Sequence, residues 1–149
     1  MTAADSLPPP TLTPICEVQA EMGERFVLSG TPLGERAVSE VGALRISGHR
    51  LNASLAGKAA ADWLIVAPDR SFAMLDVRFT VRTDDDALIF VQYNGRLRFS
   101  ATGPHRAVVA PRFETGDPRY GWLNSIQAIG TGLFDPATRQ LRYAFYEVA

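Results

Sequence analysis

The chain of 149 residues has few of the side chains that metal and nucleophile chemistry commonly uses. It contains one cysteine (Cys16), one lysine (Lys58) and two histidines (His49 and His105). A single cysteine excludes an internal disulfide and fits a reducing compartment. So few His and Cys residues cannot supply the three or four His/Cys ligands of a typical zinc site; the alternative is a mixed His/carboxylate site, and we expect no metal. A Schiff-base mechanism would have to use Lys58, which lies in a predicted loop.

Motifs of the common cofactor-dependent and hydrolytic enzymes are also missing. The chain has no G-x-S-x-G elbow, no G-x-x-x-x-G-K-[ST] loop and no dinucleotide-binding G-x-G-x-x-G. Their absence removes the usual support for α/β-hydrolase chemistry, nucleotide hydrolysis and Rossmann redox chemistry. We therefore expect any activity of this chain to need no cofactor.

Charge and hydropathy limit the partners. There are 15 basic and 16 acidic residues, which gives a formal net charge of -1, and the basic residues are scattered. A phosphate backbone selects for a concentrated positive patch, so nucleic acid is not expected as a partner. No segment approaches the roughly 20 apolar residues of a membrane span, and the first residues do not resemble a secretion signal. We expect a cytoplasmic protein that binds a small molecule and neither nucleic acid nor membrane.

What the chain does have is short runs of alternating apolar and polar residues. They recur from Ile15 to Val148, separated by Gly, Pro, Asp and Asn, and the first four are Ile15 to Glu21, Glu24 to Leu28, Arg36 to Val41 and Ala43 to Ser47. This spacing predicts an all-β fold of about ten strands. Closure into a single antiparallel β-barrel of lipocalin or streptavidin type would hide the strand edges. Residues 15–149 are thus predicted to form one barrel domain, and the proline-rich residues 1–14 a flexible arm.

Turn signals divide these runs. Thr83 to Asp86, Asn94-Gly95 and Asp135 to Thr138 predict hairpin turns. Over Leu123 to Gly132, the glycines Gly130 and Gly132 favour a strand that ends at a bend or at a close backbone approach. A short helical turn is predicted at Asp117 to Tyr120, where proline suits the first helical position.

Three groups of residues are candidates for chemistry, and each also has an ordinary structural interpretation. Strict alternation from Leu75 to Arg82 places Asp76, Arg78 and Thr80 on one strand face, which either lines a polar cavity or is a solvated face with an ion pair. The loop from Pro111 to Asn124 is either a functional loop or a crossover whose aromatic residues plug one barrel end.

The third group is Asp62-Trp63. A carboxylate beside an aromatic ring is either a general base whose pKa is raised by burial or a turn aspartate next to a core tryptophan. His49, in the segment Ser47 to Arg50, is either a proton shuttle or an exposed loop histidine. Cys16 is most simply a small buried apolar residue.

The order and spacing of several segments resemble a bacterial and fungal family known as domain of unknown function 3237 (DUF3237). These segments are Ala61-Asp62-Trp63, Leu75 to Asp85, Asn94-Gly95-Arg96, Phe113 to Gly116, Tyr120 to Asn124, and Gly130-Thr131-Gly132. The resemblance covers nearly everything from Ile15 to Val148. It implies a compact antiparallel barrel, commonly paired into homodimers, whose motif residues face the interior. One departure is Asp85-Asp86, where the family pattern has Asp-Gly.

If the barrel interior holds Asp76, Arg78, Glu114, Tyr120 and Asn124, we expect them to serve a function. Burying a polar group that has no partner costs roughly 1–3 kcal/mol. Our leading hypothesis is a cofactor-independent acid–base enzyme, namely a lyase, isomerase, hydratase or cyclase acting on a small aromatic or carbonyl-bearing metabolite. Asp62 or Glu114 would be the general base, and Arg78 with Tyr120 or Tyr93 would stabilise an oxyanion. Asp76 would orient Arg78. The other predicted substrate-binding residues are Trp63, Thr80, Trp122, Asn124 and His49.

Two alternatives belong to other classes of protein. A non-catalytic barrel that carries a small molecule would have the same cavity but no acid with a strongly shifted pKa. A partner-binding module would have a filled barrel and an exposed aromatic patch. The enzyme hypothesis also predicts a specific geometry, in which Asp76 and Arg78 point inward and meet Glu114 or Tyr120 across the cavity.

Overall fold

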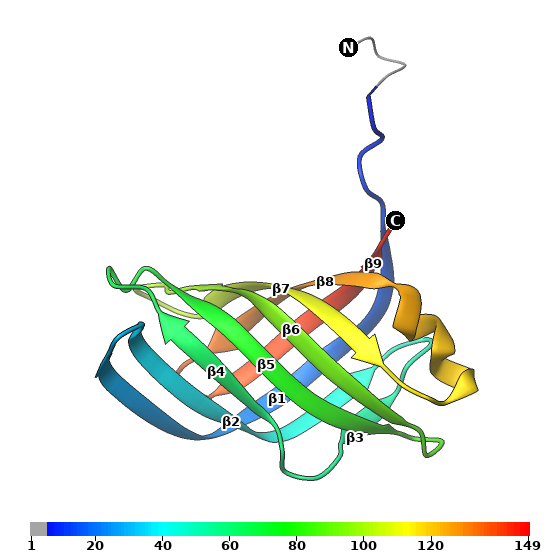
Figure 1. Cartoon of the computed structure of the whole chain (residues 1–149), viewed down its shortest axis with the longest axis horizontal. Coiled ribbons are helices and arrows are strands. Elements are labelled where there is room, and N and C mark those ends of the chain that lie inside the picture. Colours follow the sequence, from blue (N-terminus) through cyan, green and yellow to red (C-terminus); the bar gives the residue numbers. More distant parts are fainter. Residues whose placement is uncertain (1–5) are drawn as a thin grey trace.

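A computed structural model describes residues 6–149 of the chain. Within this range nine strands pair antiparallel in the order β1-β9-β8-β7-β6-β5-β3-β2-β4, and further β1–β2 and β5–β4 pairings close the sheet into a barrel (Figure 1). The strands are β1 (Leu12–Thr31), β2 (Gly34–Ser47), β3 (Ala53–Leu55), β4 (Ala61–Val66), β5 (Phe72–Thr83), β6 (Leu88–Arg98), β7 (His105–Glu114), β8 (Gln127–Asp135) and β9 (Gln140–Val148). The predicted single antiparallel β-barrel is confirmed.

Alternation along each strand determines which side chains fill the barrel. In β5 the odd-numbered residues from Ala73 to Thr83 are buried, whereas the even-numbered ones are half-buried or exposed. The same period of two in β7 buries Ala107, Val109 and Phe113. The buried apolar residues of the strands join into one hydrophobic core inside the barrel. Its burial is the main stabilising contribution to the fold.

Two predicted strand breaks are absent because bulges keep the strands continuous. β1 and β2 are each one long strand, and their register shifts between Glu21 and Met22 and again between Met22 and Arg25. The Asn94-Gly95 hairpin is wrong, because β6 passes straight through it. Gly95 is instead a point of close approach, since a Cβ there would lie 2.6 Å from a methyl carbon of Val109.

Two other predicted turns are present. β5 and β6 are joined at Thr83 to Asp86, where the Thr83 hydroxyl accepts from the Ala87 amide at 2.7 Å. Asp86 has a φ of 71°, so this chain carries an acid in a left-handed position that favours glycine. The turn after Asp135 connects β8 to β9, and the Arg139 amide donates to the Asp135 carbonyl at 2.8 Å.

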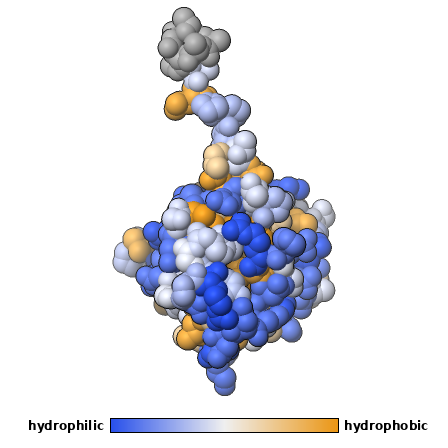
Figure 2. Space-filling model, turned by 90° about the vertical axis from the view of Figure 1, so that its right-hand side faces the viewer, coloured by the Kyte–Doolittle hydropathy of each residue, from blue (hydrophilic) through white to orange (hydrophobic). Residues whose placement is uncertain are grey.

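A short 3-10 helix, η2 (Pro118–Ser125), closes one end of the barrel. Asp117 caps its N-terminus, and Leu123 is fully buried against the core. Trp122 lies under the Arg50 guanidinium, 3.6 Å from the ring centroid, and the Tyr120 hydroxyl donates to Asp85 at 2.7 Å. Figure 2 shows this end of the molecule as mainly hydrophilic. The segment therefore behaves as the predicted plug, and the strand predicted from Leu123 begins only at Gln127.

The N-terminal boundary differs from the prediction. Residues 6–10 are exposed and extend away from the barrel (Figure 1), but β1 begins at Leu12, whose partner is Val148. Thr11 and Ala149 also exchange backbone hydrogen bonds. The last residues of the predicted arm are therefore part of the sheet, and the prediction for residues 1–5 lies outside the described residues.

Candidate functional site

The end of the barrel opposite η2 holds a pocket of about 120 Å³. Its apolar walls come from six strands, and polar groups reach it from Arg25, Ser39, Asp62, His105, Arg139 and Tyr143. The apolar lining consists of Met22, Leu64, Leu75, Leu97, Phe99, Phe134, Pro136 and Leu141. A smaller void of about 30 Å³ lies deeper and shares Asp62 and Tyr143 with the pocket. Because several polar side chains line this pocket inside the barrel, it is the candidate functional site.

Asp62 is placed by a local break in sheet pairing. β4 pairs with β5 at Asp62–Val77 and again at Ile65–Met74, but not between these two points. There the Asp76 amide donates to the Asp62 carboxylate at 3.0 Å instead of to a strand carbonyl. The side chain thus replaces part of the ladder, and it is held by the backbone in a fixed position facing the pocket.

Burial changes the acidity of this carboxyl group. Asp62 is only 8 % exposed, and its pKa is raised to about 7, chiefly because burial disfavours the charged form. The nearby Asp76 charge also raises the pKa, whereas the Asp76 amide and Arg25 lower it. A carboxyl group with a pKa of about 7 can either accept or give up a proton near neutral pH.

Two buried tyrosines lie near Asp62. The rings of Tyr93 and Tyr143 meet edge to face with centroids 5.7 Å apart. Burial raises the pKa of both phenols, and the Asp62 charge raises it further. Both therefore stay protonated near neutral pH and are hydrogen-bond donors. Tyr143 lines the pocket as well as the deeper void, whereas Tyr93 lines only the void.

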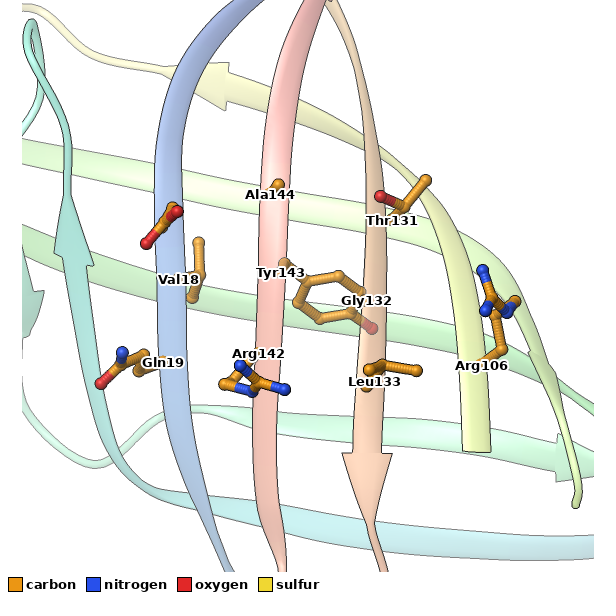
Figure 3. A pocket seen from close by; sticks show the side chains of 10 residues that line it. Val18, Gln19, Arg106, Thr131, Gly132, Leu133, Arg142, Tyr143 and Ala144 are labelled. Atoms are coloured by element: carbon orange, nitrogen blue, oxygen red, sulfur yellow. The ribbon is translucent and has the colours of Figure 1, made fainter. Parts of the chain in front are cut away.

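The Tyr143 ring needs the glycine beside it. Gly132 on β8 pairs with Tyr143 on β9, and a Cβ on Gly132 would collide with the Tyr143 ring and the Arg142 carbonyl. Figure 3 shows the Tyr143 ring reaching from β9 to Gly132. The glycines predicted to mark a close approach do so, because Gly130 similarly lies under Phe145.

The predicted orientation of Asp76 and Arg78 is wrong. Both lie on the outer face of β5, where they form an ion pair of 3.4 Å, and the Arg78 side chain is 53 % exposed. Thr80 shares this face, and the half-buried Trp63 lies beside Arg78 on the outside of the barrel, 5.6 Å from its ring centroid to the guanidinium carbon. The cause is the strand parity: Val77 and Phe79 are the residues that fill the core, so their neighbours must face out.

The other predicted site residues fall into two groups. Glu114 is exposed on the outer face of β7, while Tyr120, Trp122 and Asn124 belong to the segment around η2 at the closed end. The Asn124 amide group bonds to the backbone of Thr115. His49 is exposed in the loop after β2. None of these side chains lines the pocket, and of the predicted set only Asp62 and Tyr93 lie inside the barrel near it.

Several pocket residues escaped the sequence analysis. Tyr143 follows directly from the alternation Leu141, Tyr143, Phe145 in the last strand, so a consistent use of strand parity would have found it. Ser39 faces inward because it pairs with Asp62. Arg25 could not have been found this way, because a bulge reverses the alternation before it.

A second hollow lies on the outer surface and is separate from the interior site. It measures about 330 Å³ and runs over β1, β9 and β8, with Arg142 on the middle strand and Arg106 of β7 at one side (Figure 3). In the part of the chain that the structure describes, no group of three or more His, Cys, Asp or Glu side chains is arranged to hold a metal ion. Over the same residues, no helix is long and apolar enough to cross a membrane.

Comparison with known proteins identifies the family. The family model described as protein of unknown function (DUF3237) matches residues 10–148. The chain belongs to this family. No match was found among curated proteins.

Solved structures share the barrel of this DUF3237 protein at low sequence identity. A β-barrel-like protein from Acinetobacter baumannii is 24 % identical with a TM-score of 0.86, covering 97 % of this chain and 99 % of its own. A conserved protein of unknown function from Rhodopseudomonas palustris is 19 % identical with a TM-score of 0.86, covering 96 % and 100 %. An enzyme from Penicillium herquei is 19 % identical with a TM-score of 0.74, covering 97 % and 98 %. These likenesses show the fold.

Proposed function

We propose that this DUF3237 barrel is a cofactor-independent acid–base enzyme that moves a proton on a small carbonyl-bearing molecule, with Asp62 as the general base. The observation that carries the proposal is a buried carboxyl group with a pKa of about 7 that faces an interior pocket. Enzymes use burial in this way to bring the pKa of a general acid or base close to the operating pH. That a structural neighbour from Penicillium herquei is described as an enzyme is consistent with the proposal.

The chemistry follows from which groups are charged. Above pH 7 the Asp62 carboxylate removes a proton from the carbon next to a substrate carbonyl, and the C–H electron pair moves to form an enolate. Tyr143, which stays protonated, donates a hydrogen bond to the enolate oxygen. Asp62 then returns the proton to a different atom of the substrate. The net reaction is an isomerisation, and neither an oxidant nor another reactant is consumed.

The size and lining of the pocket limit the substrate. Pockets for drug-sized ligands usually measure about 300–1,000 Å³, whereas this one measures about 120 Å³. It therefore accepts a small molecule or the reacting end of a longer one. Leucine and phenylalanine walls such as Leu64, Leu75 and Phe134 favour an apolar body attached to the carbonyl group. Burial of the reacting atoms among these side chains also excludes water from the developing enolate.

Proton transfer can be tested before the product is known. The protein is incubated in D₂O with a panel of small ketones and 2- and 3-oxo acids, and the loss of C–H signals is followed by proton NMR. We expect accelerated exchange with the native protein and a fall of roughly 100-fold in Asp62→Asn. Glu21→Gln, which removes a carboxylate from the outer face of β1, is the matched control and should exchange at the native rate.

Three outcomes would contradict this assignment. A panel in which no compound exchanges faster than in buffer would remove the support for an enolising enzyme. Exchange that survives in Asp62→Asn but is lost in Glu114→Gln would move the base to the outer surface. Tight binding of a panel compound without exchange, unchanged in Asp62→Asn, would favour the non-catalytic carrier. The filled, cavity-free barrel expected of a partner-binding module does not match the pocket described above.

A further inference from the structure

A bulge in β1 turns Arg25 toward the pocket. Between the pairs Met22–Val41 and Arg25–Ser39, β1 contains two residues where β2 contains one. The extra residue reverses the alternation, so Arg25 joins the inward face on which Met22 lies before the bulge. With uninterrupted alternation, Glu24 would take the inward position and place a second carboxylate near Asp62.

Arg139 fastens this bulge. Its guanidinium donates to the Met22 carbonyl at 3.4 Å and, more closely, to the Gly23 carbonyl. The Met22 amide in turn donates to the Arg139 carbonyl at 3.0 Å. Arg139 has a φ of 61°, a conformation that side-chain-bearing residues seldom adopt, and the three contacts hold it there. Of the two arginines at the pocket, Arg139 is committed to the backbone and Arg25 is the one open to a ligand.

Arg25 and Asp62 line the same pocket, and among the residues that the structure describes they form no ion pair with each other. The charge of Arg25 reaches the Asp62 carboxyl group and lowers its pKa, yet the Arg25 guanidinium takes part in none of the side-chain hydrogen bonds or ion pairs found among residues 6–149. Both groups line the pocket, whose walls are mainly apolar, and Ser39 on β2 pairs with both of them across the sheet. A guanidinium fork at the mouth of such a pocket matches the two oxygens of a carboxylate, which it binds through two parallel N–H···O bonds.

We propose that the substrate of this pocket is a small carboxylic acid that also carries an enolisable carbonyl group, with its carboxylate on Arg25 and its acidic C–H bond at Asp62. The role of Asp62 in this inference rests on the proposed function, whereas the carboxylate contact can be tested without turnover. Arg25 is then the residue that selects acids over neutral ketones. It also fixes the orientation of the substrate, because the carboxylate is held at the mouth while the carbonyl end points toward Tyr143.

Binding of a matched pair of probes tests this selection. Benzoate and benzamide have nearly the same shape, but only benzoate carries a charge. Each is titrated into nitrogen-15-labelled protein at pH 6, where Asp62 is mostly protonated, and amide shifts around the pocket are followed by NMR. We expect benzoate to bind at least ten times more tightly than benzamide. Arg25→Gln should weaken benzoate at least tenfold and leave benzamide unchanged, while Arg25→Lys should recover part of the preference.

The control variant is Arg112→Gln, which removes the same charge from the outer face of β7 and should bind both probes as the native protein does. Benzoate that binds no better than benzamide, or equally well to Arg25→Gln, overturns the inference. A spectrum of Arg25→Gln with native dispersion shows that the variant is folded. If the native protein shows no preference for benzoate while carbon exchange is intact, the role of Arg25 alone is refuted; if the native protein prefers benzoate but catalyses no exchange, the base assignment alone is refuted.

Discussion

At the scale of single residues, Asp62 makes the stability of the barrel depend on pH. Its pKa rises from 3.8 to about 7 on folding because of burial, and the charged or titratable groups that interact with it electrostatically are Arg25, Asp76, Tyr93 and Tyr143. Between these two pKa values the native state holds a proton that the unfolded chain has released. The contribution of Asp62 to stability is therefore complete below pH 4, falls as the pH rises to about 7, and is constant above.

This pH-dependent fall in the free energy of unfolding is measurable by urea unfolding at pH 5 and pH 8. At about 1.4 kcal/mol per pKa unit, the loss is at most roughly 4 kcal/mol over the whole range. In Asp62→Asn the side chain no longer titrates, so the variant should gain stability relative to the native protein as the pH rises from 5 to 8. Glu21→Gln should follow the native curve. An equal pH dependence in Asp62→Asn and the native protein would show that Asp62 keeps an ordinary acidity.

The residues of the site differ in how far sequence could predict them. Asp62 was recognisable because a carboxylate beside Trp63 enters a strand, and family resemblance drew attention to it. Asp76 and Arg78 were placed on the wrong side, because alternation identifies two faces but not which one is inside. The apolar set around Val77 and Phe79 decides this, since it is the larger and better suited to the core. Polar residues on the opposite face of such a strand are thus expected to be exposed to solvent.

At the scale of elements, alternation predicted most of the strands, and the departures have identifiable physical causes. Bulges merged the predicted pieces of β1 and of β2, and no residue type in the sequence marks them. The Asn94-Gly95 pair suggested a turn, but Gly95 is needed inside the sheet, where Val109 packs against its backbone. Local turn propensity therefore yielded to packing between strands. Arg25 owes its inward position to such a bulge and so was not predictable from a period of two.

The β8–β9 pair gives a test of how closely strands and rings are fitted. In Gly132→Ala the new methyl group would collide with the Tyr143 ring and with the Arg142 carbonyl, so Tyr143 must shift. We expect overpacking to lower the free energy of unfolding by roughly 1–3 kcal/mol, as measured in urea. The rate of carbon exchange should also fall, because Tyr143 is displaced. Gly116→Ala is the control, because nothing lies within 4 Å of its Cβ position. Equal stability of the two variants would mean that β8 and β9 accommodate the new methyl group without cost, which contradicts the close fit at Gly132.

At the scale of the whole molecule, the two ends of the barrel have different roles. η2 and the charged turn around Asp85 close one end, where Arg119 and Tyr120 bind to this aspartate. The opposite end carries the pocket and gathers the buried carboxyl group, the tyrosines and Arg25. This asymmetry has a simple basis, because the long β7–β8 connection can fold over its end, whereas the short turn between β8 and β9 leaves the other end open. The end closed by η2 thus forms the base of the barrel, and the pocket lies at the opposite end.

The outer surface beside the open end carries apolar side chains at which we expect two copies of the chain to pair, as the family resemblance implies. Phe26 and Leu28 are each 47 % exposed, Met74 is 38 % exposed, and register places Phe26 in one row with Val38 and Trp63. Contiguous exposed apolar side chains commonly mark a protein interface. The side chains form a band over β1, β2, β4 and β5, which continues the barrel wall outside the pocket.

We expect the native protein to sediment as a dimer and Phe26→Ser with Leu28→Ser to shift it toward the monomer, because the pair removes the most exposed part of this band. Leu88→Ser is the control, since Leu88 is equally exposed, at 50 %, but lies at the start of β6 near the closed end. A native monomer, or a dimer that the double variant leaves intact, would contradict this pairing. Because Arg25 lies next to Phe26, a dimer formed here would also narrow the approach to the pocket, so dissociation should speed benzoate entry as well as change the sedimentation.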